Sequence, residues 1–261
     1  MARSTETVDF DRLARFIAGA FIACGMPTDN AGKAAALMAR ADLMGKDAHG
    51  MFRLPQYVQR IQAGGLNVSP RFRLIEDRVA TALIDGDNGL GHLVMSHAAE
   101  LAMRKAEQTG VAWLGARHSN HAGPAALYAM MPLARDMIGV YVAVGSANHL
   151  PPWGGTEILL STNPISFAIP SGKNPPVVLD MATTVAAYGK VKTMAQNGET
   201  MPEGWMIDRL GRPPDRSDAG HRGVSPADRR RQGIRSCAGF RNPGRHPQDP
   251  AKQRAVRGKP H

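Results

Sequence analysis

The sequence predicts a mixed α/β protein in which helices precede the first strand. Three helical patterns fill the first 65 residues, and each ends close to a glycine. Strand-like runs then alternate with helical ones, and residues 79–118 form a strand-to-helix-to-strand passage. Together these observations predict N-terminal helices followed by a mixed sheet.

The three N-terminal helices are predicted from apolar spacing and end signals. From Asp9 to Cys24, apolar residues recur at three- and four-residue steps. Thr28 is expected to cap a second, Ala-rich helix that ends at Gly45. Pro55 suits the first turn of a third helix.

The remaining elements are predicted from alternating apolar runs between turn residues. Helices are expected at 92–110 and near 123–136, and the strand at 138–147 is expected to be buried. The strands are expected at residues 71–77, 79–87, 111–118, 138–147, 164–170 and 176–182.

Charge is concentrated at the end of the chain. The 261 residues carry a net charge of +10. Residues 214–261 hold 12 Lys and Arg against 4 Asp and Glu, which leaves 20 − 18 = +2 for residues 1–213. Apolar periodicity also stops near Pro213, so 214–261 is expected to be a disordered basic tail. The other expected regions are a helical region with a catalytic loop (1–67) and a mixed α/β region (68–213).

Localisation is predicted from the cysteines and from hydropathy. Cys24 and Cys237 lie in very different surroundings, which favours a reducing compartment. The N-terminus is charged, and no apolar run approaches the roughly 20 residues of a membrane helix. A cytoplasmic protein is expected.

The first candidate site is the stretch KDAHGMFRLPQY. Histidine exchanges protons near neutral pH, and His49 lies among small residues. Arg53 directly precedes a helix start, where its guanidinium group and free backbone N–H groups could hold a carboxylate. The alternative is that His49 caps the preceding helix and that Arg53 is a surface charge.

The second candidate site is the stretch ARHSNHAGPAALYA. His118 and His121 lack nearby Cys or acidic partners, so no metal site is expected. Gly123 and its following proline could open a helix whose N-terminus meets a phosphate or a carboxamide, with Ser119 and His121 as donors. A hydrogen-bonded turn without a ligand is the alternative.

The third candidate site is an irregular loop and the strand beyond it. Gly, Pro, Asn and Trp crowd residues 145–155, as in loops that line pockets. Asp180 ends an apolar run, and on this pattern alone a helix N-cap is favoured over a cofactor ligand. The glycines of DGDNGLGH lack the spacing of a Rossmann dinucleotide motif.

Taken together, the chain resembles the malate/L-lactate dehydrogenase family of NAD(P)-dependent 2-oxo acid reductases, whose relatives include sulfolactate, ureidoglycolate and diketogulonate enzymes. The resemblance runs in family order from about residue 9 to residue 213. It is carried by the stretches DAHGMFRLPQYVQRIQAGGL, HSNHAGPAALYA, PPWGG, STNPISFAIP and LDMATTVAAYGKV. It implies a non-Rossmann nicotinamide-binding fold, NAD or NADP as cofactor, a 2-oxo or 2-hydroxy acid substrate and a homodimer.

The resemblance also implies roles for individual residues. His49 matches the proton donor, although Ala48 stands where most members have Ser, and Arg53 matches the residue that holds the substrate carboxylate. Asn148 and His149 match a loop that varies with substrate. The implied cofactor contacts are Ser119, His121 and Gly123 at the nicotinamide and Pro176, Val177, Val178, Leu179, Asp180, Met181 and Ala182 on a strand.

The tail departs from the family pattern, since the resemblance implies a Pro-Ile-Gly-Gly-x-Lys-Gly motif and an apolar helix beyond residue 213. With codons chosen within the degeneracy of the code, reading residues 227–235 one nucleotide out of step yields PIGGxKGFG. In that frame Gln232 can give only Lys or Arg. We therefore expect a chain that is incomplete at its C-terminus through a frameshift near Pro213.

Two other functions are weighed against the dehydrogenase. An inactive family fragment would follow if the missing cofactor motif and helix are needed for turnover. A nucleic-acid-binding protein could use DRRRQGIR as an arm that contacts phosphates, but the tail has Phe240 as its one aromatic residue.

Overall fold

A computed structural model describes residues 7–145, 150–186, 194, 199–200, 202 and 204–206. The chain divides into two compact units, Met1–Ser146 with Ser161–Thr183, and Ala147–Leu160 with Thr184–His261. All helices and strands named below belong to the first unit. In the second, Leu150 and Leu160 form a backbone bridge, with the N–H of Leu150 donating over 3.0 Å. The domain boundaries at residues 67 and 213 remain predictions.

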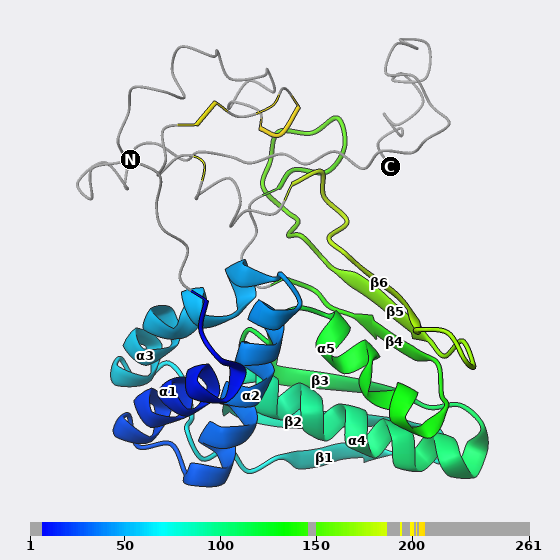
Figure 1. Ribbon diagram of the computed structural model, residues 1–261. Coiled ribbons are helices and arrows are strands. Elements are labelled where there is room, and N and C mark those ends of the chain that lie inside the picture. Colours follow the sequence, from blue (N-terminus) through cyan, green and yellow to red (C-terminus); the bar gives the residue numbers. More distant parts are fainter. Residues whose placement is uncertain are drawn as a thin grey trace, which may run out of the picture. The chain divides into compact units, whose positions relative to one another are not determined.

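The three N-terminal helices form as predicted, with one difference at a cap. They are α1 (Phe10–Ala23), α2 (Thr28–Leu43) and α3 (Leu54–Gln62) (Figure 1). The Asp9 carboxylate accepts from the backbone N–H of Arg12 and caps α1. Thr28 was expected to cap α2, but Pro27 occupies the cap and Thr28 is the first helical residue, because the extended backbone ends one residue earlier.

These helices pack around one core. Small residues on α2, Ala31, Ala34 and Ala35, are buried and let the large side chains of α1 approach closely. Tyr57 of α3 lies in the same cluster and is 3% exposed. The largest fully buried side chains of the cluster are Ile17, Phe21, Met38 and Leu90.

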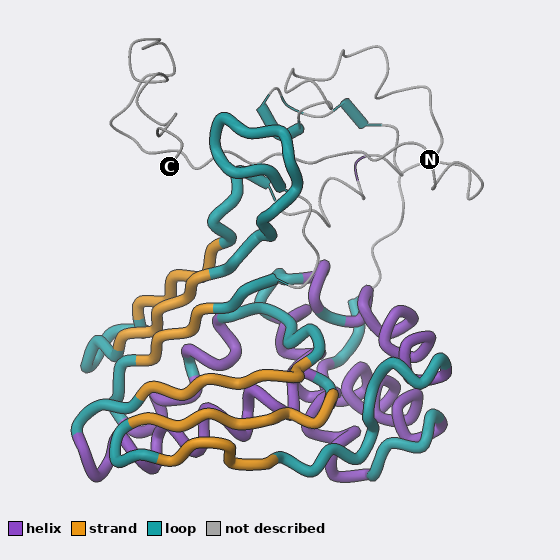
Figure 2. The backbone as a smooth tube through the Cα atoms, turned by 180° about the vertical axis from the view of Figure 1, so that it is seen from behind, coloured by secondary structure: helices purple, strands orange, loops and turns teal. Residues whose placement is uncertain are grey.

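The first sheet has the order β1-β2-β3, with β1 (Arg73–Asp77), β2 (Thr81–Gly89) and β3 (Trp113–Ser119). Strand β1 is antiparallel to β2, and β2 is parallel to β3 across helix α4 (Gly91–Thr109). Ile84 of β2 packs on Val94 and Ala98 of α4. Figure 2, seen from behind, shows the strands in front of the helices that cover their other face.

The second sheet is antiparallel, with the order β4 (Gly139–Val142), β5 (Ile165–Ile169) and β6 (Val177–Met181). The helix predicted over residues 123–136 is broken into α5 (Ala126–Ala129) and the 3₁₀ helix η3 (Met131–Arg135). Pro132 at the start of η3 has no backbone N–H to continue α5. The sequence therefore predicted the position of this helix but not its length.

The two faces of the second sheet differ in their exposure. Ser166 and Ala168 are fully buried on the face that α5 contacts. On the opposite face eight apolar side chains lie in register, and all but Ile165 are at least 38% exposed. The expectation of a buried strand at 138–147 was wrong for this face, which consists of Val140, Val142, Ile165, Phe167, Ile169, Val177, Leu179 and Met181.

Within the described residues no helix is long and apolar enough to cross a membrane.

Candidate active site

Two short 3₁₀ helices place His49 and Arg53 between α2 and α3. They are η1 (Asp47–His49) and η2 (Met51–Arg53). The Asp42 carboxylate of α2 accepts a 2.8 Å hydrogen bond from the backbone N–H of Met51. A Cβ at Gly50 would come within 2.0 Å of Oδ1 of Asp42, so a larger residue would displace the Asp42 side chain from its bond to Met51. Asp42 and Gly50 thus fix the loop that carries both predicted residues.

His49 meets His121, which comes from the loop after β3. The two imidazole rings stack with centroids 5.3 Å apart and planes 7° apart. This loop lies directly on the first turn of α4, because a Cβ at Gly91 would collide with the carbonyl oxygen of Asn120. The sequence predicted both histidines but not that they face each other.

Tyr57 of α3 contacts the stacked pair. Its hydroxyl lies 2.5 Å from Nδ1 of His121. Burial raises the pKa of the Tyr57 phenol, so the hydroxyl keeps its proton. The backbone N–H of Gly123 also points at Nδ1 of His121 over 3.4 Å, and because it can only donate, Nδ1 is the acceptor and the Tyr57 hydroxyl donates. The neutral His121 therefore carries its ring proton on Nε2.

The site keeps its histidines uncharged. Burial, and next the positive charge of Arg53, lower the pKa of His49 to about 4. Desolvation and the neighbouring His49 lower the pKa of His121 in the same direction, although His121 as a whole residue is exposed. At neutral pH both rings are therefore proton acceptors.

Arg53 is oriented by two hydrogen bonds. Its Nε donates to the carbonyl oxygen of Ala48 over 2.8 Å, and Nη1 donates to Oε1 of Gln56 over 2.7 Å. The described contacts use these two nitrogens, and Nη2 remains for an anion. Arg53 is therefore held in place by its neighbours, and its role as a carboxylate-binding residue remains a prediction.

Asp180 lies near His49 rather than at a helix end. It belongs to β6, so the helix N-cap interpretation was wrong. Its carboxylate is 3.4 Å from Nζ of Lys46, and its side chain is 12% exposed. The negative charge of Asp180 raises the pKa of His49, against the larger effects that lower it, and also raises that of Tyr141 on β4. The ion pair with Lys46 and the charge interaction with His49 place Asp180 near His49.

The other residues predicted from the family resemblance lie in three places: near His121, on or next to β6, and outside the described residues. Ser119 ends β3, where its Oγ donates to the carbonyl oxygen of Asn120, and Gly123 has a left-handed φ of 77° and donates its N–H to Nδ1 of His121 over 3.4 Å. The helix expected to open at Gly123 begins at Ala126 instead. Asn148 and His149 lie outside the described residues. The remaining predicted residues flank or alternate with Asp180 on β6, and they are Pro176, Val177, Val178, Leu179, Met181 and Ala182.

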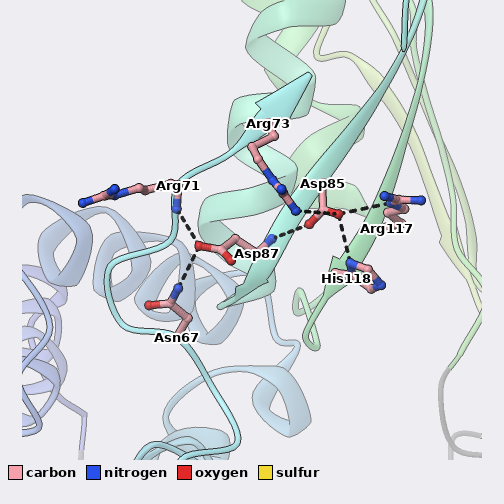
Figure 3. Close-up of polar contacts among 7 residues, drawn as sticks. All are labelled: Asn67, Arg71, Arg73, Asp85, Asp87, Arg117 and His118. Carbon is pink, nitrogen blue, oxygen red and sulfur yellow. Dashed lines mark hydrogen bonds and ion pairs between the residues drawn. The ribbon is translucent and has the colours of Figure 1, made fainter. Parts of the chain in front are cut away.

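His118 belongs to a separate network around Asp85 (Figure 3). Its Nδ1 lies 3.0 Å from Oδ2 of Asp85, which also accepts from Nε of Arg117 over 3.1 Å and lies 3.5 Å from Nη2 of Arg73. Asp85 is 1% exposed, whereas the side chains of Arg73 and Arg117 that pair with it are exposed to solvent. A backbone N–H from Asp87, with His118 and Arg117, lowers the pKa of Asp85 to about 2.

This second network links strands and shows no metal geometry. It connects β1, β2 and β3 on the face opposite α4, and Asp87 extends it to Asn67 and Arg71. No group of three or more His, Cys, Asp or Glu side chains in the described part of the chain is placed to hold a metal ion.

Sequence reasoning missed three residues of the site: Lys46, Tyr57 and His92. Tyr57 follows Arg53 by four positions, and helical spacing could have shown that both lie on one face. His92 directly follows Gly91 in the glycine-rich stretch that lacks the Rossmann spacing. Lys46 carried no signal of its own.

Comparison with known proteins supports the resemblance. A family model described as malate/L-lactate dehydrogenase matches residues 8–226. The chain belongs to the malate/L-lactate dehydrogenase family. The match ends inside the basic segment, slightly beyond the residue 213 expected from the motifs.

Individual members of the malate/L-lactate dehydrogenase family align with most of the chain. A malate dehydrogenase of Pyrococcus horikoshii is 42% identical over 201 residues, which cover 77% of this chain and 55% of that protein. A ureidoglycolate dehydrogenase of Escherichia coli is 33% identical over 189 residues, covering 72% and 54%. The chain thus spans about half the length of these relatives.

A solved member of the family confirms the mixed α/β fold. The sulfolactate dehydrogenase of Methanocaldococcus jannaschii superposes with a TM-score of 0.75 at 35% identity, over 81% of this chain and 61% of that one.

Proposed function

We propose that the chain carries the proton-transfer and carboxylate-binding residues of a dehydrogenase. This enzyme transfers hydride between a nicotinamide cofactor and a 2-oxo or 2-hydroxy acid. The observation that carries this proposal is the stack of His49 on His121 in the same loop system that orients Arg53. A proton acceptor and an anion-binding group are both needed for a 2-hydroxy acid. Family membership supports the same chemistry.

In the direction of alcohol oxidation, His49 accepts the hydroxyl proton, because its ring is neutral at pH 7. Arg53 binds the substrate carboxylate through Nη2 while Ala48 and Gln56 hold the guanidinium group in place. Binding this carboxylate offsets the positive charge that lowers the pKa of His49. The substrate thereby makes His49 a better base.

The residues present fit a nicotinamide cofactor at one place. Nδ1 of His49 is buried without a hydrogen-bond partner among the described residues, and a polar ligand beside it would satisfy that atom. Ser119, His121, Gly123 and Asp180 would hold the cofactor, which we propose to be NAD or NADP. When bound, the cofactor supplies or accepts the hydride.

A second candidate is an inactive family fragment, and the exposed apolar face of β4, β5 and β6 supports it. Such a face is normally covered in a stable protein. The chain also spans about half the length of its relatives. We therefore expect weak or absent turnover from the chain as it stands. No finding supports the nucleic-acid-binding alternative, whose tail lies outside the described residues.

Turnover assays on two chains separate these candidates. Oxidation of NADH and NADPH would be followed with a panel of 2-oxo acids, for this chain and for one in which the reading frame is shifted near Pro213. Turnover restored by the shifted frame supports the dehydrogenase and the frameshift together. Resequencing the gene across that codon tests the frameshift alone, and an intact frame would rule it out.

We also propose a homodimer and a cytoplasmic location. Sedimentation of the same preparations tests the homodimer, and fractionation of the source cells tests the location.

A further inference from the structure

His92 is a completely buried histidine beneath the site. It lies in the first turn of α4 and is 0% exposed. Neither of its ring nitrogens has a hydrogen-bond partner among the described residues. A buried polar group without a partner destabilises the fold, and an aliphatic side chain of similar size would avoid this cost. The imidazole at this position therefore requires an explanation beyond filling the core.

Its contacts connect it to the acid–base pair. The His92 ring meets the Tyr57 ring edge to face, with centroids 5.8 Å apart and planes 84° apart. Tyr57 in turn bonds Nδ1 of His121. On its other side, Nε2 of His92 would be 2.9 Å from a Cβ at Gly123. The ring thus lies between α3 and the loop that carries His121.

The absence of a side chain at Gly123 has a direct consequence. With φ at +77° and His92 against it, this position accepts only glycine without strain. Gly123 also donates its N–H to His121. His92 therefore touches both residues that bond Nδ1 of His121, namely Tyr57 and Gly123.

We propose that His92 is a positioning residue for His121. The buried ring of His92 holds Tyr57 and Gly123 so that both direct their hydrogen-bond donors to Nδ1 of His121. It thereby fixes the His121 tautomer with the proton on Nε2. Its importance for catalysis rests on the proposed function, but the tautomer is a property of the folded chain by itself.

Other charged groups also act on these rings and must be considered in any titration. His121 is influenced by His49, Arg53 and His92, and His92 by His49. The pKa of His49 is additionally raised by the charge of Asp180 and lowered by that of Lys46, both smaller effects than its burial.

The test is the tautomer and titration of His121, measured by ¹⁵N NMR of the histidine rings in the full chain. His92→Leu and His92→Gln are compared with the parent chain, each also in a Tyr57→Phe background. His97→Gln is the matched control, because His97 lies on the same helix and contacts Phe72, outside the site. Thermal unfolding of every variant shows which of them fold.

If His92 acts through Tyr57, His92→Leu moves the Nδ1 resonance and the titration midpoint of His121 by more than His97→Gln does. The same substitution then has a clearly smaller effect in the Tyr57→Phe background, where the hydroxyl is absent. His92→Gln gives the same comparison if the leucine variant does not fold.

Two results would overturn the proposal. The first is a folded His92 variant whose His121 resonances are unchanged. The second is full additivity, in which replacing His92 shifts His121 equally with and without the Tyr57 hydroxyl. These outcomes do not depend on turnover. Absent turnover in the frame-shifted chain would count against the proposed function and not against this role of His92.

Discussion

The rings of His49 and His121 stack 5.3 Å apart, although one comes from a 3₁₀ helix before α3 and the other from the loop after β3. Two imidazolium ions at that separation would repel each other strongly. The pair is therefore neutral near pH 7, and it takes up at most one further proton before repulsion opposes a second. This property suits a site that takes one proton from an alcohol and returns one to a carbonyl.

Replacing Arg53 by Lys is predicted to weaken binding of the substrate acid. Lys keeps the charge but cannot donate to Ala48, Gln56 and a carboxylate in one plane. Loss of a charge-assisted bond raises KM by about 10- to 100-fold, about 1.5–3 kcal/mol. Steady-state kinetics of the frame-shifted chain measures this, with Arg60→Lys on the outer part of α3 as control. An unchanged KM would remove Arg53 from the substrate site.

The stability of the fold is predicted to fall as the pH is lowered from 6.5 towards 3. Burial lowers the pKa of His92 to about 3. Between pH 6.5 and pH 3, His92 is therefore protonated in the unfolded chain but remains neutral in the folded chain. Each such histidine contributes a slope approaching ~1.4 kcal/mol per pH unit. Urea unfolding at several pH values measures the slope. His92→Gln should reduce it by about one proton, and an unchanged slope would contradict a neutral buried His92.

Asp85→Asn is predicted to lower the melting temperature at pH 7. The folded-state pKa of about 2 lies below the ordinary value of 3.8, so the ionised carboxylate stabilises the fold above pH 4, and this contribution is lost as the pH falls to 2. The difference between parent and variant should therefore shrink between pH 4 and pH 2. Glu76→Gln, in an exposed pair with Arg78, is the control and should change little. Equal melting temperatures at pH 7 would show that the network in Figure 3 contributes nothing.

Two glycines in helices are predicted to respond to alanine in opposite directions. A Cβ at Gly91 would collide with a backbone oxygen of the His121 loop, which cannot rotate away, so Gly91→Ala should destabilise the fold by about 1–3 kcal/mol or more. Gly19 in α1 has nothing within 4 Å, and Gly19→Ala should stabilise by about 0.5–1 kcal/mol. Chemical denaturation measures both. If the two variants behaved alike, the close approach of the loop to α4 would be wrong.

Local sequence signals predicted most elements because they depend on neighbours in the chain. The helix α1, the proline start of α3 and the strand-to-helix-to-strand passage all formed as expected. The length of α5 and the one-sided burial of β4 were missed, since they depend on Pro132 and on which face meets another element.

The site was predicted as a set of residues rather than as an arrangement. Short motifs identified His49, Arg53 and His121, whose types reveal their chemistry. Their partners were not visible, because Tyr57 looks like an ordinary helical aromatic residue and His92 like a core residue. Only the fold shows that α3 and α4 bring these two rings together beneath His121.

The most direct test of the central claim is the titration of the His49 and His121 rings by NMR, with and without a saturating 2-oxo acid such as pyruvate. The claim predicts that binding raises the titration midpoint of His49 towards neutrality, because the carboxylate offsets the charge of Arg53. It also predicts that Arg53→Gln abolishes this rise. Midpoints that do not respond to the acid, or that respond equally in Arg53→Gln, would contradict an acid–base pair coupled to a carboxylate site.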